Sequence, residues 1–220
     1  MTFYKVLAAD GSACHGGSGK WHLPKGKRPG KWMPVIEDIV PCERGYHLVT
    51  LAQLPEWLGA VIWIAEGRGE HLEQSYKHVF SQARLIGKVD SWDERAARLF
   101  ACDCAERVLP LYETKYPDDT RPRHAIEVAR RYAHGNATDE ELAAAWDAAG
   151  DAAWAAAWGA AWGAAWAAAR GAAWAAAWAA AGGAAWDAAW AAARAAASAA
   201  ERAWQSSRLA AIFGLKGEEE

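Results

Sequence analysis

Cysteine and histidine side chains near the N-terminus are the groups best suited to chemistry. Cys14, His22, Cys42 and His47 offer the thiolate and imidazole ligands that zinc prefers. Cys42 and His47 also come closest to pairing a nucleophilic thiol with a histidine, although such sites are recognised by geometry and not by spacing. Two interpretations stay open, a zinc site or buried thiols with hydrogen-bonded histidines, and we assign no catalytic residue.

A glycine-rich basic loop between Gly16 and Arg28 is the second candidate site. It is similar to a phosphate-binding loop, but Cys14 stands in place of the first glycine and Trp21 follows the lysine. Its backbone amides and nearby cations could still bind an anion, or the segment is an ordinary solvated loop. The residues expected to bind the anion are Gly17, Ser18, Gly19, Lys20, Lys25 and Arg28.

Charge and aromatic residues around this loop bear on nucleic-acid binding. The net charge of −3 gives no general attraction for nucleic acid, although residues 1 to 35 hold six Lys or Arg and one Asp. Trp21 and Trp32 flank the basic run and could stack on bases, but tryptophans more commonly anchor such a loop to the core. We therefore do not expect a nucleic-acid partner.

The first 90 residues alternate short β-rich runs with glycine and proline, which predicts a small mixed domain. The expected strands are Phe3–Leu7, Tyr46–Val49, Ala60–Ile64 and Ala83–Ile86, with a short helix over Leu51–Leu58. A helical pair is expected over residues 91–137. Ser91–Glu94 reads as a capping box that opens a helix ending before Pro110, and Arg121-Pro122 opens a second helix that stops at Gly135.

The segment 138–212 is an alanine-rich repeat. After a capping box at Thr138–Glu141, the unit Trp-(Ala/Gly/Asp)-Ala-Ala recurs, and alanine has the highest helix propensity. A period of four advances the large residue by about 40° per repeat, so the tryptophan stripe winds around one helix. The segment is therefore expected to be a long helix, or a helical hairpin broken at Gly182-Gly183. The tryptophans expected at an assembly interface are Trp154, Trp158, Trp162, Trp166, Trp174, Trp178, Trp186 and Trp190.

Three interpretations of the repeat stay open. Helix-on-helix packing, within the chain or between copies, would bury the tryptophans and favours a homo-oligomer. The repeat could also be the product of tandem expansion, with no individual tryptophan selected for a role. Ala152–Ala169 holds eighteen residues without a charge, which permits membrane association, but alanine and glycine drive insertion weakly.

Together these patterns predict an α+β protein, a small mixed N-terminal domain followed by an all-α body. The expected parts are residues 1–90, 91–137 and 138–212, with an acidic tail at 213–220. The four cysteines are too few for a disulfide framework, so we expect free thiols. The first ten residues show no signal-peptide pattern, and we expect a cytoplasmic protein.

Two stretches resemble known families. Residues 1–89, with Lys5-Val6-Leu7, the Cys14–Lys25 segment and the Pro41–Leu48 motif, resemble an uncharacterised domain common in bacteriophage proteins, for which no activity is established. Members often have cysteine after the Gly-Tyr-His-Leu run, where this chain has Val49, which weakens the zinc interpretation.

The second stretch, Ser91–Gly135, is similar to helical immunity proteins of bacterial toxin systems. The resemblance rests on the Arg98–Arg107 motif and on Tyr116-Pro117-Asp118-Asp119. It implies a toxin or host defence factor as partner. Our first hypothesis is a non-enzymatic, phage-encoded binding or scaffold protein that self-associates through the repeat. The alternatives are a nucleotide- or anion-binding protein or enzyme using the Gly16–Arg28 loop, and a membrane-associated protein.

Overall fold

The computed structural model describes residues 1–149 and 199–215. The chain divides into two compact units. The sheet unit comprises Met1–Ala97 and Glu201–Glu220, and the helical unit comprises Arg98–Ala200. A four-stranded antiparallel sheet precedes the helices, which confirms the predicted α+β class.

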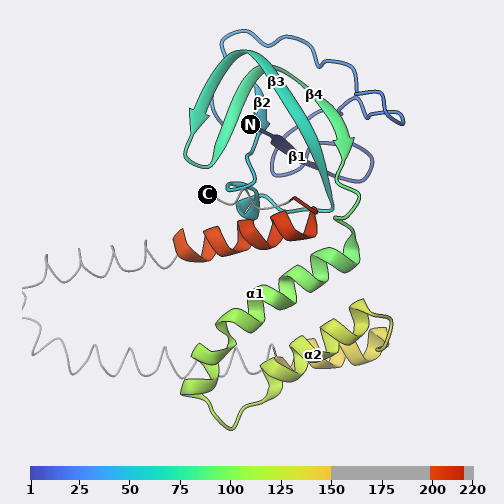
Figure 1. Ribbon diagram of the computed structural model, residues 1–220, viewed down its shortest axis with the longest axis vertical. Coiled ribbons are helices and arrows are strands. Elements are labelled where there is room, and N and C mark those ends of the chain that lie inside the picture. Colours follow the sequence, from blue (N-terminus) through green and yellow to red (C-terminus); the bar gives the residue numbers. More distant parts are fainter. Residues whose placement is uncertain (150–198, 216–220) are drawn as a thin grey trace, which may run out of the picture. The chain divides into compact units, whose positions relative to one another are not determined.

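The sheet has the strand order β1-β3-β4-β2, and neighbouring strands are antiparallel. The strands are β1 (Phe3–Leu7), β2 (Tyr46–Leu48), β3 (Val61–Gln74) and β4 (Lys77–Lys88). Just beyond β2, the Tyr4 amide donates to the Val49 carbonyl at 2.7 Å and the Val49 amide donates back at 3.0 Å. The two edge strands therefore meet, and the sheet curls toward a closed barrel whose longest part is the β3–β4 hairpin (Figure 1).

The short strands were predicted well and the long hairpin was not. β1 has the predicted bounds, and β2 ends one residue earlier than expected. β3 and β4 continue far beyond the predicted runs. The distal half of β3 was missed because it is largely exposed and polar and so lacks an apolar signal, whereas the missed start of β4, Lys77–Gln82, is largely buried. The helix predicted over Leu51–Leu58 is a single 3₁₀ turn, η1 (Leu54–Glu56), too short for an α-helix.

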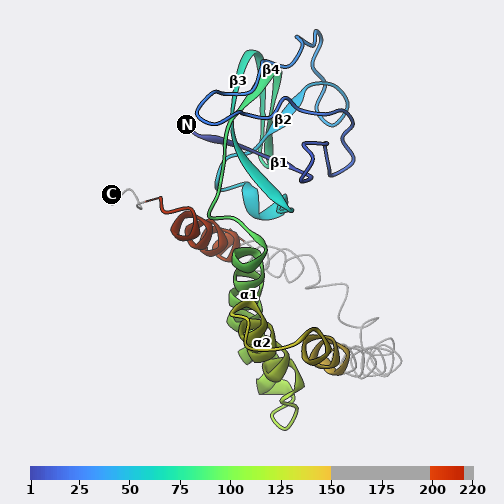
Figure 2. The same cartoon turned by 90° about the vertical axis from the view of Figure 1, so that its right-hand side faces the viewer.

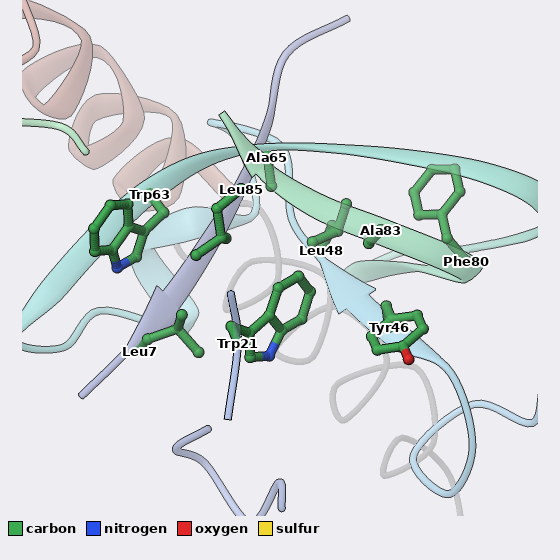
Figure 3. Packing of buried hydrophobic residues seen from close by; sticks show 9 residues of the cluster. All are labelled: Leu7, Trp21, Tyr46, Leu48, Trp63, Ala65, Phe80, Ala83 and Leu85. Carbon is green, nitrogen blue, oxygen red and sulfur yellow. The ribbon is translucent and has the colours of Figure 1, made fainter. Parts of the chain in front are cut away.

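The core lies between the curled sheet and the loops that cover it (Figure 3). Leu7, Leu48 and Leu85 from three strands are fully buried, and Trp21 enters the same cluster from the glycine-rich loop. Amides of Gly30, Met33 and Ile36 donate to carbonyls of β4, so the segment 30–36 that follows the glycine-rich loop runs beside this strand. The buried indole of Trp21 confirms its anchoring role and removes it from any base-stacking surface.

The described C-terminal residues complete the sheet unit. Residues 199–212 are helical (Figure 2). Leu209 in this helix is fully buried. Phe213 packs against Tyr4 at 5.7 Å and against Trp92 at 6.3 Å between ring centroids. The segment predicted as an acidic tail therefore begins with a packed aromatic side chain.

Two helices follow the sheet, α1 (Glu94–Lys115) and α2 (Arg121–Ala133). The predicted start of α1 was wrong in detail, because the Asp93 carboxylate accepts the Ala96 amide at 2.7 Å and takes the capping position expected for Ser91. α1 also continues through Pro110 for one further turn. The start and end of α2 are confirmed, and Gly135 just beyond it has φ +73°.

The helix over residues 139–149 begins with the predicted capping box. The Thr138 hydroxyl accepts the Glu141 amide at 3.2 Å, and the Glu141 carboxylate accepts the Thr138 amide at 2.7 Å. Ala145 packs with Ala125 and Val128 of α2 in a small core. The tryptophans predicted at the assembly interface and the break at Gly182-Gly183 lie outside the described residues. In the ranges 1–149 and 199–215, no helix is long and apolar enough to cross a membrane.

Candidate functional site

A cavity of about 770 Å³ lies in the sheet unit. Its lining includes the four residues considered as zinc ligands together with most of the predicted anion-binding loop. These lining residues are Cys14, Gly17, Ser18, Gly19, Lys20, His22, Cys42 and His47. The zinc candidates and the anion-binding candidates, which the sequence suggested separately, thus line the same cavity. Lys25 and Arg28 instead pair with each other through their backbones in a separate small turn.

A tight turn presents Cys42 at the edge of this cavity. The amides of Val40 and Arg44 each donate to the other residue's carbonyl at 2.8 Å. Cys42, directly after Pro41, has a left-handed φ of +70°. This backbone conformation is unfavourable for a residue with a Cβ atom. Gly45 follows with φ +125°, and a Cβ atom there would lie 2.4 Å from Val79 Cγ1. The turn therefore lies tightly against β4 while its thiol stays exposed.

The thiol of Cys42 meets a buried lysine. Lys77, at the start of β4, is only 4% exposed, and its ammonium donates to Cys42 Sγ at 2.8 Å. The Tyr76 hydroxyl lies 3.8 Å from the same sulfur. The hydrogen bond from Lys77, then that from Tyr76, lowers the pKa of Cys42 from its ordinary value. This arrangement favours a thiolate at an accessible position.

Aromatic rings hold the aliphatic and charged parts of Lys77. Its Nζ lies 5.0 Å from the centre of the Tyr76 ring and 5.7 Å from that of Trp57. The Trp57 indole donates to the Tyr76 carbonyl at 3.0 Å, which fixes the two rings in a stacked arrangement. Cation–π contacts of this kind partly offset the removal of the ammonium from water.

His47 is a neutral neighbour of the thiolate. Its Nε2 accepts the Cys42 backbone amide at 3.0 Å, so the proton of the neutral ring is on Nδ1. Burial, with the charges of Lys77 and Lys5 nearby, lowers the pKa of His47 to about 4. Burial likewise lowers the pKa of Lys5 to about 8, and its ammonium donates to the His47 carbonyl at 3.1 Å. His47 therefore orients the turn and is not placed to deprotonate the thiol.

The shared cavity does not assemble the four zinc candidates into a ligand set. Within the part of the chain that the structure describes, no group of three or more His, Cys, Asp or Glu side chains could hold a metal ion. Cys14 donates to the Val6 carbonyl at 3.3 Å, and Cys42 and His47 are engaged with Lys77 and with the backbone. Because of these contacts, the side chains line the same cavity but their sulfur and nitrogen atoms do not point toward one metal position.

Ion pairs in the described part of the helical unit are exposed or partly buried, with the Asp103 side chain 12% exposed. Arg123 pairs with Glu113 at 2.7 Å, and Arg130 pairs with Asp103 at 2.7 Å and with Glu106. These pairs fix α2 against α1. Two large apolar side chains stay exposed, Leu111 at 77% and Trp146 at 68%. The described part of this unit therefore exposes two apolar side chains of the kind that often contact partner proteins.

A family model described as Imm-5 like putative immunity protein matches residues 87–212. The chain belongs to this family. The match confirms the immunity-protein resemblance inferred from Ser91–Gly135 and extends it through the repeat. An Imm-5 like chain is expected to have a non-enzymatic, immunity-type role with a protein as partner. No curated protein and no solved structure matches this Imm-5 like chain.

Sequence reasoning missed the lysine that sets the state of the Cys42 thiol. Lys77 lies 35 positions from Cys42, and only the pairing of β2 with β4 brings them together. Tyr76 and Trp57 were missed for the same reason. One local signal existed, because Lys77 opens a strand of buried residues where a charged side chain needs a specific partner.

Proposed function

We propose that this protein neutralises a toxin or host defence factor by binding it, without catalysing a reaction. The family match over residues 87–212 is the observation that carries the proposal. The helical unit suits such a role because ion pairs hold α1 and α2 together while Trp146 and Leu111 project into solvent. Exposed tryptophan is a frequent anchor of protein interfaces. A phage gene acting in the host cytoplasm fits the resemblance of residues 1–89.

The test is a titration of protection against a candidate bacterial toxin. Cells would express that toxin at a fixed level while the amount of the full chain is varied. A binding protein protects only near equimolar amounts, and the variant Trp146→Ala should weaken protection, whereas Leu51→Ala on the sheet unit should not. Protection far below equimolar amounts would indicate catalysis and contradict the proposal.

We further propose that the protein self-associates through its Ala/Trp repeat. The repeat period supports this, since it predicts a winding stripe of tryptophans, and a large exposed aromatic surface is unfavourable in water. A truncation at Gly135 would be a poor test, because the helix 199–212 and Phe213 complete the sheet unit. Replacing the eight interface tryptophans by alanine keeps helix propensity and removes only the aromatic surface. Light scattering should give an oligomer for the parent and a monomer for the variant, and equal masses would contradict self-association.

A second candidate function is anion binding in the cavity. The observation in its favour is that Gly17, Ser18, Gly19 and Lys20 line the same space as Lys77. Calorimetry with inorganic phosphate and with ATP, for the parent and for Lys20→Met, tests it. Equal binding heats for the parent and Lys20→Met would show that the glycine-rich loop does not bind the anion.

A further inference from the structure

We propose that Cys42 is a covalent site of the sheet unit, where its thiolate exchanges with a small disulfide that carries carboxylates. This inference goes beyond the proposed toxin binding and rests on a different unit. It starts from the cavity and from the contact between Cys42 and Lys77.

The burial of Lys77 requires an anion beside it. Lys77 is only 4% exposed as a residue, and an ammonium on such a side chain is costly unless a counter-charge compensates for lost hydration. The sulfur of Cys42 accepts its hydrogen bond at 2.8 Å, and the other neighbours described above are aromatic rings. The thiolate form of Cys42 is thus the form that the fold accommodates, and the lowered pKa of this thiol agrees with the geometry.

Cys42 is also the cysteine whose thiolate is open to reagents. Its side chain is exposed, and both it and Lys77 line the cavity of about 770 Å³. Cys14 lines the same cavity, but its thiol donates to the Val6 carbonyl at 3.3 Å, a contact that needs the proton on sulfur. Cys102 is buried. Low pKa combined with access is the combination that makes a cysteine reactive.

The backbone around Cys42 argues against acyl transfer. Attack on a carbonyl carbon needs free amide donors for the oxyanion. The amide of Cys42 donates to His47, and those of Glu43 and Arg44 both donate to the Val40 carbonyl. Displacement at sulfur develops no oxyanion, so thiol–disulfide exchange is the chemistry that this turn permits.

Charge in the cavity selects an acidic partner. Lys5, Lys20, Arg44 and Lys77 line it, against the carboxylate of Glu43 and that of Asp10, which pairs with Lys20 at 3.4 Å. Exchange consumes the thiolate, and Lys77 would then be left buried without its anion. A carboxylate on the incoming group can replace that charge, whereas a neutral or cationic group cannot.

The exchange balances without a further reactant. The Cys42 thiolate attacks one sulfur of the small disulfide, and a new sulfur–sulfur bond forms as the old one breaks. The electron pair leaves on the second sulfur as a thiolate, which takes a proton from water. The cysteine sulfur is oxidised to the mixed disulfide, and the small disulfide is reduced and releases one thiol.

The experiment treats the reduced full chain with glutathione disulfide, bis(2-hydroxyethyl) disulfide or cystamine at equal concentration. Intact mass and peptide mapping follow the adduct at each cysteine. We expect adduct first at Cys42, fastest with glutathione disulfide and slowest with the cationic cystamine. Equal labelling of Cys14 and Cys42, or faster reaction with cystamine, would overturn the proposal.

Two variants and a pH profile separate chemistry from folding. Lys77→Met keeps the aliphatic stem and should move the pH midpoint of Cys42 alkylation upward while slowing exchange at pH 7. Each unit of pKa costs about threefold in rate, because a more basic thiolate is also a better nucleophile. Cys14→Ser is the matched control and should leave the rate unchanged. If Lys77→Met does not fold, the parent's own profile decides, since a midpoint at or above the ordinary thiol value of about 8.5 would refute the thiolate.

Discussion

The two units place their charges differently. In the sheet unit, Lys77 lies buried between two aromatic rings and a thiol. In the helical unit, Arg123 and Glu113 pair with side chains that are 48% and 29% exposed. An exposed pair adds little to stability, whereas a buried charge demands a specific partner and shifts the pKa of that partner. We therefore expect reactivity to be concentrated in the sheet unit, while the family match spans residues 87–212, which include the whole helical unit and parts of the sheet unit.

The largest expected difference is between a buried leucine of the sheet unit and an exposed leucine of the helical unit. Leu85 is fully buried in the sheet and Leu111 of α1 is 77% exposed. Leu85→Ala should lower the free energy of unfolding by about 3 kcal/mol, through lost burial and a cavity. Leu111→Ala should change it by less than about 0.5 kcal/mol. Hydrogen exchange resolved by peptide measures each unit separately, and equal effects would break the comparison.

Acid should weaken the sheet unit. The pKa of His47 is about 4 in the folded chain and near 6.5 when unfolded, so between these values only the unfolded chain takes up the proton. Stability is complete above about pH 6.5 and falls toward pH 4, by roughly 1 kcal/mol between pH 7 and 5 after allowing for partial exposure. His47→Gln should flatten this slope in urea titrations at several pH values. A remaining slope is expected from His78, whose pKa burial also lowers.

The capping box tests the helical unit alone. Thr138→Ala removes the hydroxyl that accepts the Glu141 amide and should cost about 1 kcal/mol. Thr138→Ser retains the acceptor and serves as the control. Faster exchange confined to peptides of residues 138–149 is the expected result. A change in the sheet unit as well would show that the two regions are not independent.

The surface ion pair gives the smallest effect. Arg123→Met should lower stability by no more than about 0.5 kcal/mol, and the loss should shrink further in high salt. Lys77→Met should behave differently, because Lys77 is buried and its effect on the Cys42 pH midpoint should depend less on salt. Urea titrations of Arg123→Met at two salt concentrations check the first effect. A loss that does not depend on salt would indicate a packing role for Arg123.

Local patterns predicted the elements that depend on neighbouring residues. The bounds of β1, the start of α2 and the Thr138–Glu141 capping box follow from alternation, proline placement and reciprocal side-chain bonds. The distal half of β3 could not be predicted, because the exposed polar residues there carry no apolar pattern. The start of α1 was misplaced because Ser91 and Asp93 are both good caps, and only the folded turn selects Asp93.

The sequence by itself determined the α+β class, the immunity-type helical body and some of the residues that line the cavity. It placed Cys14, His22, Cys42 and His47 under consideration, but with zinc as the chemistry. Only the tertiary structure decided that Cys42 meets Lys77, because β2 and β4 are paired across more than thirty residues of chain. Helices and caps are set by contacts within a few residues, whereas the ionisation state of a thiol is set by whichever charge the fold buries beside it.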